Sequence, residues 1–514
     1  MAESPTEDTG GDDSPDRTSG TSGTGGDDSQ DRTSGTGSDS NNSGTGSNGH
    51  VVLAAADSAP YTSLRSRPIP RAQRFALGRS LRKQVPRSRL ADWEPPATRR
   101  DPVEQLHENH VGRIDRLVPV RVGRMIASPY GFLRGSATVM GADVARLPST
   151  GITPVICGDA HIGNFGMYAS PERELVLDLN DFDEAHPGGW EWDLRRLVAS
   201  AWVLGRQNGA REDQCEEAVV ACVATYRDHI RELYDEPLMA RSFDRFDVER
   251  LRETASRKQL RKQIDKAARK AHGRTSDRAL PRFTEQTADG RRIVEEPPLI
   301  TRVDDDEYEL LAQGLDDYLA TLAPHWRRVL GGYTLVDIVH KVVGVGSVGL
   351  RAYIALLEGS GDDDVVFLQL KQARRSVIAR FVHGESAWHD HQGQRVVEYQ
   401  QALQTVSDPL LGWTTVAGRQ YYVRQFRNMK GSVPLDAIDG GSLGDYAGIC
   451  GYLLAKGHAR TSGASMIAGY LGGSDKVGQA LATFARAYAD QTERDHARLL
   501  QAVDSGEVAA ERGV

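Results

Sequence analysis

The stretch CGDAHIGNFG, residues 157–166, places a carboxylate, an imidazole and a carboxamide within six positions. Asp159 precedes Asn164 by five residues, so one tight loop can direct the carboxylate at a substrate hydroxyl and the amide oxygen at a metal ion. Both residue types also stabilise ordinary turns. Because G-D-x-H-x-x-N is expected by chance in under ~1% of chains this long, we interpret the stretch as a phosphoryl-transfer site.

Two predicted strands flank this loop. The run ITPVIC, residues 152–157, is compact and rich in β-formers, and ELVLDLNDF, residues 174–182, alternates apolar and polar residues as a half-buried strand does. Magnesium prefers oxygen ligands, so Asp181, at the end of the second run, is predicted to supply the main metal-binding carboxylate. Asp178 and Asp183 are alternatives, because a strand alternates its faces and the register is open.

A second candidate region lies far along the chain, in GVGSVG, residues 344–349. The match to G-x-G-x-x-G is weak in a chain with 53 glycines, and an accidental match is the alternative. A dinucleotide fold needs a helix after the glycines, whereas here a Gly/Asp turn at 359–364 predicts a hairpin. In a kinase small lobe the glycines cover the phosphates, and a strand lysine reaches the α and β phosphates. The residues predicted to contact the nucleotide are therefore Gly344, Gly346, Ser347, Gly349 and Lys371.

Several weaker candidates complete the predicted site. A helix acid should hold the ammonium of Lys371; Glu398, in QRVVEYQQAL, is the predicted partner and Glu385 the reserve, with a solvated helix glutamate as the alternative. His458 or Arg460, in GHARTSG, would reach the cleft, although basic residues at a helix C-terminus also favour its dipole. Arg134, in FLRGS, is a candidate for phosphate binding, with a structural salt bridge as the alternative.

The segments CGDAHIGN and LNDFDEA resemble the catalytic loop and metal-binding strand of the protein-kinase-like superfamily. The resemblance is strongest to aminoglycoside and choline kinases, where the loop reads roughly H-G-D-x-x-x-x-N and the strand ends in I-D-F-D. The usual first histidine of that loop is Cys157 here. Asp193, in WDLRRL, resembles the acid that opens the next helix and braces the loop. The resemblance implies a phosphotransferase that uses ATP and Mg²⁺.

Over about residues 100–500 the chain also resembles an uncharacterised bacterial family, domain of unknown function 2252. The segments that carry this second resemblance are FLRGSA, CGDAHIGNFG, DLNDFDEA, GQRVVEYQ and YVRQFRNMKG. The likeness covers most of the chain and implies no known substrate.

The order of the predicted parts is inverted relative to kinases, because the glycines and Lys371 follow Asp159 by about 200 residues. We interpret this as a circularly permuted, two-lobed, protein-kinase-like α+β fold with the catalytic-loop segment before the small β-rich lobe; closely placed termini make such a rearrangement feasible. The alternative is that only the site at 158–183 is real. The predicted domains are a disordered acidic Gly/Ser-rich tail at 1–60, a large mostly helical lobe with the catalytic loop and metal-binding strand at 61–330, a small β-rich nucleotide-binding lobe and hinge at 331–437, and C-terminal helices completing the large lobe at 438–514.

Charge is distributed unevenly along the chain. The first 50 residues contain ten acidic residues and two arginines, so they carry the whole formal net charge of -8 and can bury almost nothing apolar. The remainder is formally neutral, which gives no strong nucleic-acid signal. Long apolar runs and a secretory signal pattern are both missing from the sequence, so we expect no membrane span and a cytoplasmic location. The oligomeric state is open.

The predicted function is ATP- and magnesium-dependent phosphoryl transfer to the hydroxyl of an unknown small-molecule acceptor, with Asp159 as the base. A nucleotidyl transferase on the same scaffold and a catalytically silent nucleotide-binding sensor are the alternatives. A metal-dependent phosphoesterase is a further alternative, because Asp159 and His161 form a D-x-H pattern. That site would also need a G-N-H segment, which the sequence lacks.

Overall fold

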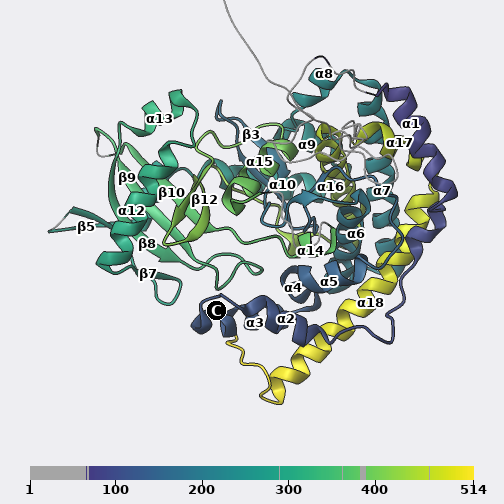
Figure 1. The fold of residues 1–514 in the computed structure, drawn as a ribbon, viewed down its shortest axis with the longest axis horizontal. Helices are drawn as coiled ribbons and strands as arrows, with labels where there is room; N and C mark the ends of the chain where they lie inside the picture. Colours follow the sequence, from purple (N-terminus) through teal and green to yellow (C-terminus); the bar gives the residue numbers. More distant parts are fainter. Residues whose placement is uncertain are drawn as a thin grey trace, which may run out of the picture. The chain divides into compact units, whose positions relative to one another are not determined.

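The computed structural model describes residues 65, 69–288, 290–361, 363–382, 389–461 and 463–513, all of which fall in one compact unit of the chain. Figure 1 shows a mixed α+β arrangement with a strand-rich part and a helix-rich part. The middle of the chain forms the strand-rich part, and segments on both sides of it in sequence form the helix-rich part. The predicted tail at 1–60 lies outside the described residues.

The strand-rich part is centred on a six-stranded antiparallel sheet with the order β11-β12-β10-β9-β8-β7. Its strands are β7 (Ile300–Arg302), β8 (Thr334–Lys341), β9 (Ala352–Glu358), β10 (Val365–Gln372), β11 (Gly412–Val416) and β12 (Arg419–Gln425). β9 and β10 form the hairpin that the Gly/Asp turn predicts, with Val365 opposite Glu358. Lys371 lies near the far end of β10, opposite Ala352 on one side and Tyr422 on the other.

The structure contains an edge strand, β7, that was not predicted from the sequence. Its surroundings, ADGRRIVEEPPLITRVDDDE, are rich in proline and charge and predict an irregular connection. Ile300 nevertheless pairs with Lys341 and is buried in a cluster with Ile293 and Val339. The sheet therefore begins before residue 331, because a distant strand supplies the pairing and the apolar contacts that the local sequence does not reveal.

Helices cover both faces of this sheet. Side chains of β9 alternate between the two faces, as strand geometry requires. Tyr353 joins a buried cluster with Tyr318 of α12 (Asp305–Leu319), next to α13 (Pro324–Leu330). Ile354 points the other way and joins a cluster that includes Ala279 of α11 (Ser276–Phe283). A further helix, α15 (Gln392–Leu403), contacts β11 and β12.

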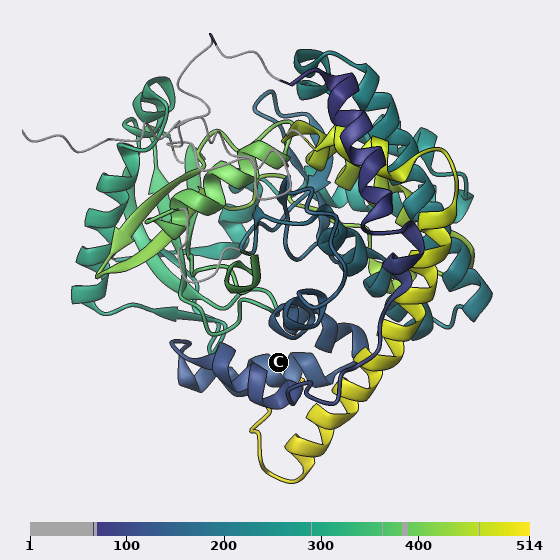
Figure 2. The same cartoon turned by 45° about the vertical axis from the view of Figure 1, so that its right-hand side comes forward.

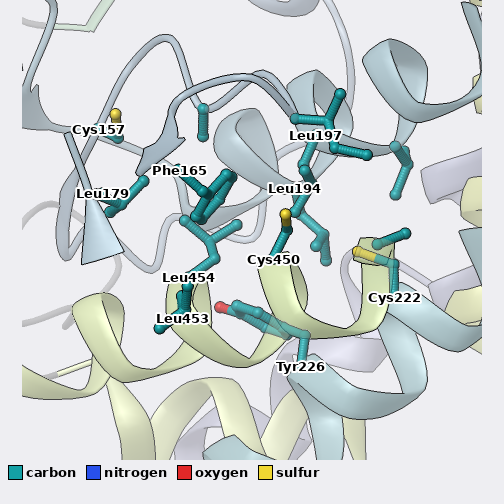
Figure 3. Close-up of a cluster of buried hydrophobic side chains, with 14 of the residues drawn as sticks. Cys157, Phe165, Leu179, Leu194, Leu197, Cys222, Tyr226, Cys450, Leu453 and Leu454 are labelled. Carbon is teal, nitrogen blue, oxygen red and sulfur yellow. The ribbon is translucent and has the colours of Figure 1, made fainter. Parts of the chain in front are cut away.

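The helix-rich part is built around five long or buried helices. They are α6 (Trp190–Gln207), α7 (Glu212–Asp235), α16 (Gly440–Arg460), α17 (Ala464–Leu471) and α18 (Lys476–Asp504). α7 and α16 approach closely at Gly451, where an added Cβ would come 2.3 Å from the carbonyl oxygen of Cys222. Figure 3 shows part of the core that these helices share, with Cys450 of α16 beside Leu194 of α6.

Three short strand pairs complete the β structure. The pairs are β1 (Val155–Ile156) with β4 (His186–Pro187), β2 (Phe165–Ala169) with β3 (Leu175–Leu179), and β5 (Thr284–Thr287) with β6 (Gly290–Ile293). Phe165 and Leu179 pack into the same core as α16, as Figure 3 shows. The loop at 157–164 therefore lies between β1 and β2 and rests on the helical core. The run predicted as the next strand, at 174–182, contains β3 instead, and β2 was not predicted from the sequence.

The remaining helices surround this core. They are α1 (Arg71–Ser80), α2 (Pro102–His110), α3 (Val118–Ile126), α4 (Pro129–Gly135), α5 (Ala137–Val144), α8 (Leu238–Ser242), α9 (Val248–Thr254), α10 (Lys258–His272) and α14 (Ala379–Val382). In Figure 2 the purple helix α1 lies beside the yellow C-terminal helices, and α1 contacts α17. Among the described residues, none of the helices combines the length and apolar character needed to cross a bilayer.

Candidate functional site

The loop that carries Asp159 makes a tight turn after β1. Gly158 has a φ of 79°, and a Cβ there would lie 2.3 Å from the carbonyl oxygen of Glu184, so both the backbone conformation and the space require glycine. The backbone N–H of His161 donates to the carbonyl oxygen of Asp159 at 2.8 Å, and that of Asn164 donates to His161 at 2.8 Å. These bonds fix the direction of the two side chains that the sequence singles out.

Asp193 braces this loop from the first turn of α6. Its carboxylate accepts hydrogen bonds from the backbone N–H groups of Cys157 at 2.7 Å and Gly158 at 2.8 Å. His458 Nε2 lies 3.2 Å from the same carboxylate, and both side chains are fully buried. The contacts match the bracing position predicted for Asp193.

Asn164 ties the loop to the segment after β3. Its amide nitrogen donates to the carbonyl oxygens of Asp159 at 3.1 Å and Asp181 at 3.0 Å, and to the Cys157 sulfur at 3.3 Å. The three bonds use the nitrogen end of the amide. The oxygen end is the part that would coordinate a metal ion.

The Asp159 side chain is partly exposed to a cavity, and it forms an ion pair with the buried Arg196. Arg196 Nε donates to Asp159 Oδ1 at 2.7 Å, and 22% of the Asp159 side chain is exposed. Burial raises the pKa of Asp159 to about 6, against the opposing effect of Arg196. A carboxyl group with a pKa near neutrality is suited to exchange a proton with a substrate.

The three acidic candidates after the loop have different environments. Asp178 is 2% exposed on β3 and pairs with the equally buried Lys456 at 2.5 Å. Asp181 and Asp183 instead face Lys371, whose Nζ lies 3.6 Å from Asp181 and 2.5 Å from Asp183. Burial acts to lower the pKa of Lys371, but the two carboxylates outweigh it and raise the pKa.

The glycine loop between β8 and β9 covers the same region. Gly344 and Gly349 have φ values of 74° and 87°, which L side chains rarely adopt. Gly344, Gly346 and Ser347 line a cavity together with Asp159 and Asn164. Gly349 lies just outside it, where a Cβ would come 3.1 Å from the Arg113 side chain.

Two cavities meet at this point. The Asp159 cavity, of about 130 Å³, is lined by Asp159, His161, Asn164, Asp183 and several arginines. The Lys371 cavity, of about 410 Å³, is lined by Lys371, Arg424, Lys430, Met167 and Phe426 among others. Asp181, Gly344 and Ser347 line both cavities, so they mark the junction. The loop and the lysine strand, separated by about 200 residues in sequence, therefore contribute to one continuous site.

Several sequence-predicted residues lie elsewhere. Glu398 is not the partner of Lys371: it contacts His389 at 2.8 Å and accepts from Gln394 at 2.8 Å. The pairing cannot be read from sequence because it depends on how the sheet meets the loop. Glu385 lies outside the described residues.

His458 and Arg460 do not line either cavity. His458 is buried between Asp193 and Tyr226, and Arg460 donates to the carbonyl oxygen of Ala402 at 3.0 Å. α16 turns this end toward the helical core, so its histidine supports the loop from beneath. Arg134 does line the Asp159 cavity.

Some site residues were missed by sequence reasoning. Tyr422 donates to Asp183 at 3.0 Å and lies in β12 beside Arg424. Both belong to the quoted segment YVRQFRNMKG, which is interpreted from the sequence as the hinge, without a site role for either side chain. Arg113 and Arg121 have no such signal, because isolated arginines are frequent in this chain.

The donor set of the site fits a magnesium ion. Asp181 offers a carboxylate and Asn164 an amide oxygen, both at the edge of the Asp159 cavity. In the part of the chain that the structure describes, no group of three His, Cys, Asp or Glu side chains is arranged to hold a metal ion. Magnesium is commonly held by one or two carboxylates together with substrate phosphates and water. The residues present are thus compatible with a magnesium ion that arrives with a nucleotide.

The chain belongs to the bacterial family described as "Uncharacterized protein conserved in bacteria (DUF2252)", which matches residues 113–502. The match includes the loop at 157–164, the glycine loop and the strand of Lys371. Searches of curated proteins and of solved structures found no match.

Proposed function

We propose that this protein is an ATP- and magnesium-dependent phosphotransferase that acts on the hydroxyl group of a small molecule. The observation that carries the proposal is the convergence of Asp159, Asp181 and Lys371 on two adjoining cavities beneath one glycine loop. Each residue type has a role in phosphoryl transfer, in which catalysis consists mainly of positioning and electrostatic stabilisation.

The nucleotide occupies the Lys371 cavity in this proposal. A volume of about 410 Å³ falls in the usual range for small-molecule sites. Lys371, Arg424 and Lys430 provide positive charge for phosphates, and the glycine loop can approach them closely because it has no side chains at Gly344 and Gly346. Met167 and Phe426 offer apolar surface for a base.

Asp181 and Asn164 would hold the magnesium ion at the junction of the cavities. The ion would neutralise charge on the β and γ phosphates. Lys371, already beside Asp181, would then exchange this contact for the phosphates of the bound nucleotide.

Asp159 is the proposed base, because it lies on the side of the junction away from Lys371. The acceptor oxygen forms a bond to the γ phosphorus, and its proton passes to the Asp159 carboxylate. The bond from the γ phosphorus to the bridging oxygen breaks, and ADP leaves with that electron pair. Arg196 keeps Asp159 oriented through the 2.7 Å ion pair.

The fold itself is included in the proposal as a permuted, two-lobed, kinase-like arrangement. The strand order along the chain supports it: β8, the glycine loop, β9 and then β10 with Lys371 give the lysine the third-strand position. Asp193 supports it as well, because it braces the loop through backbone N–H groups. The fold is called permuted because the loop of Asp159 precedes the sheet in this chain, which is the reverse of the order in kinases.

Labelled ATP tests the proposal directly. The full-length protein is incubated with Mg²⁺, a metabolite extract and ATP labelled at either the γ or the α phosphate. Transfer of γ label to an extract component, lost in Asp159→Asn, is the expected result. Transfer of α label would instead indicate a nucleotidyl transferase. Binding without consumption would indicate a sensor, and ester cleavage without ATP would indicate a phosphoesterase; any of these three results contradicts the proposal.

A further inference from the structure

The Asp159 cavity has an unusual concentration of positive charge. The arginines that line it are Arg113, Arg121, Arg134, Arg374 and Arg375. They come from α3, α4 and the segments before α3 and after β10, so four separate parts of the chain direct guanidinium groups at one small space.

Arg134 makes the fewest polar contacts of these arginines. Its Nε is buried without a hydrogen-bond partner, and within the described residues its guanidinium pairs with no carboxylate. Arg134 lines the same cavity as Asp159 and His161 of the loop. The salt bridge considered for Arg134 from sequence is therefore not formed among these residues.

Arg121 and Arg374 lack an anionic partner in the same part of the structure. Arg121 is 1% exposed; it contacts His110 Nε2 at 2.8 Å and donates to Gly135 at 2.6 Å, while its Nε has no partner. Arg374 reaches only the Asn109 carbonyl oxygen, at 3.5 Å. Burial and then the charge of Arg121 lower the pKa of His110 to about 3, so this histidine is a neutral partner of Arg121, whose own pKa burial lowers to about 10.

Among the described residues, the carboxylates that line the cavity form no ion pair with Arg134, Arg121 or Arg374. Asp159 is paired with Arg196, and both Asp181 and Asp183 face Lys371. Glu184 accepts the backbone N–H of Val377 at 2.6 Å. Arg121 is buried, and Arg134 and Arg374 are half-buried. Positive charge removed from water without an anionic partner is costly, so these residues suit the cavity to an anion that enters from outside.

We propose that the Asp159 cavity is the acceptor subsite and that the acceptor carries its own oxyanion, a phosphate ester or a carboxylate, which Arg134, Arg121 and Arg374 recognise. This inference rests on the proposed function, because Asp159 must face the acceptor hydroxyl. Arginine suits the task because its planar donors match two oxygens of such a group. The volume of about 130 Å³ limits the bound part to a compact group.

The test measures anion binding while the nucleotide site is filled. Inorganic phosphate and, separately, acetate are titrated calorimetrically into the full-length protein saturated with a non-hydrolysable ATP analogue and Mg²⁺, so that the γ-phosphate position is occupied. We expect one of the two anions to bind. Arg134→Gln and Arg374→Gln should each weaken that binding by about tenfold, as expected for a charge-assisted hydrogen bond.

Matched controls separate this effect from general charge loss. Arg486→Gln removes a surface arginine that is 62% exposed and paired with Glu212, and should leave anion binding unchanged. Affinity for the analogue is measured for every variant, and circular dichroism checks the fold. If Arg134→Gln does not fold, Arg374→Gln, whose side chain makes a single long contact, carries the test.

The outcomes that overturn the inference are distinct. Analogue binding without phosphate or acetate binding, or anion binding that both cavity variants leave intact, rejects the oxyanion subsite but not the phosphotransferase. A parallel loss of analogue and anion binding assigns the arginines to the nucleotide site and also rejects the subsite. Failure of the analogue to bind the unaltered protein rejects the proposed function, and the acceptor subsite with it.

Discussion

The loop of Asp159 and the strand of Lys371 are held at the site by different kinds of interaction. The loop is fixed by backbone hydrogen bonds to the buried side chains of Asp193 and Asn164, inside the helix-rich part. Lys371 reaches across from the sheet, and its contacts there are ion pairs with the partly exposed Asp183 and Asp181. One half of the site thus belongs to the buried core, and the other is joined to it by charge.

This difference separates stability from ligand binding. Buried hydrogen-bond networks are costly to disrupt. Lys371 is itself buried, with 4% of its side chain exposed, but its partners Asp183 and Asp181 are 24% and 51% exposed, so solvent weakens the contribution of these ion pairs to folding. Changes beneath the loop should therefore affect the fold first. Changes at Lys371 should affect the nucleotide first.

The largest expected effect is on the rate. Asp159→Asn keeps the size of the side chain and an acceptor for Arg196 but removes the base, so the rate of γ-phosphoryl transfer should fall by ~10²- to 10⁴-fold. The effect is measured as the rate of ADP release with a metabolite fraction that receives label from γ-labelled ATP. Unchanged turnover would show that Asp159 is not the base and that the loop does not supply the catalytic group.

Loss of the Asp193 carboxylate, which accepts hydrogen bonds from the loop backbone, should have the largest effect on the free energy of unfolding. Asp193→Ala leaves two backbone N–H groups and the buried His458 without their acceptor, and should lower the free energy of unfolding by ~3–5 kcal/mol. Urea denaturation followed by circular dichroism measures it. Asp228→Ala, at a carboxylate that is 57% exposed, is the control and should change stability by under ~1 kcal/mol. Equal stability of the two variants would show that the loop does not depend on the core.

Removal of the lysine should act on the nucleotide rather than on the fold. Lys371→Met should weaken binding of Mg²⁺ and ATP by roughly 10- to 100-fold, equivalent to the loss of a hydrogen bond to a charged group. Glu398→Gln is the matched control, because Glu398 contacts His389 and Gln394 instead, and it should bind nucleotide normally. The reverse pattern would restore Glu398 as the functional partner.

The smallest expected effect is on pH dependence. Burial raises the pKa of Asp159 to about 6, and a base acts only when deprotonated. Activity should therefore be constant above that pH and fall about tenfold per pH unit below it. A profile of kcat/KM from pH 4.5 to 8.5 shows the break. A rate that rises as the solution becomes more acidic would contradict the assignment of Asp159 as a base.

The sequence was most informative where function depends on neighbours along the chain. Asp159, Asn164 and Asp193 lie within one short region, and the structure brings them together around a turn whose glycine is also visible in the sequence. The hairpin that carries Lys371 was also predictable, because a Gly/Asp turn separates two β-rich runs.

The individual side-chain contacts between distant segments could not be predicted. The pairing of Lys371 with Asp183, rather than Glu398, depends on the placement of the sheet against the loop. The arginines of the Asp159 cavity, such as Arg121 and Arg374, are individually unremarkable in sequence and gain meaning only when helix and strand packing collects them. Strand β7 was missed because its pairing partner, not its own composition, makes it a strand.

The contact between Asp193 and His458 spans 265 positions of the chain. A ribosome that adds ~5–20 residues per second completes the loop segment tens of seconds before it delivers the histidine beneath it. During synthesis the loop of Asp159 is therefore complete before α16 exists, and a chain truncated ahead of that helix would contain the loop without the buried contact that supports it.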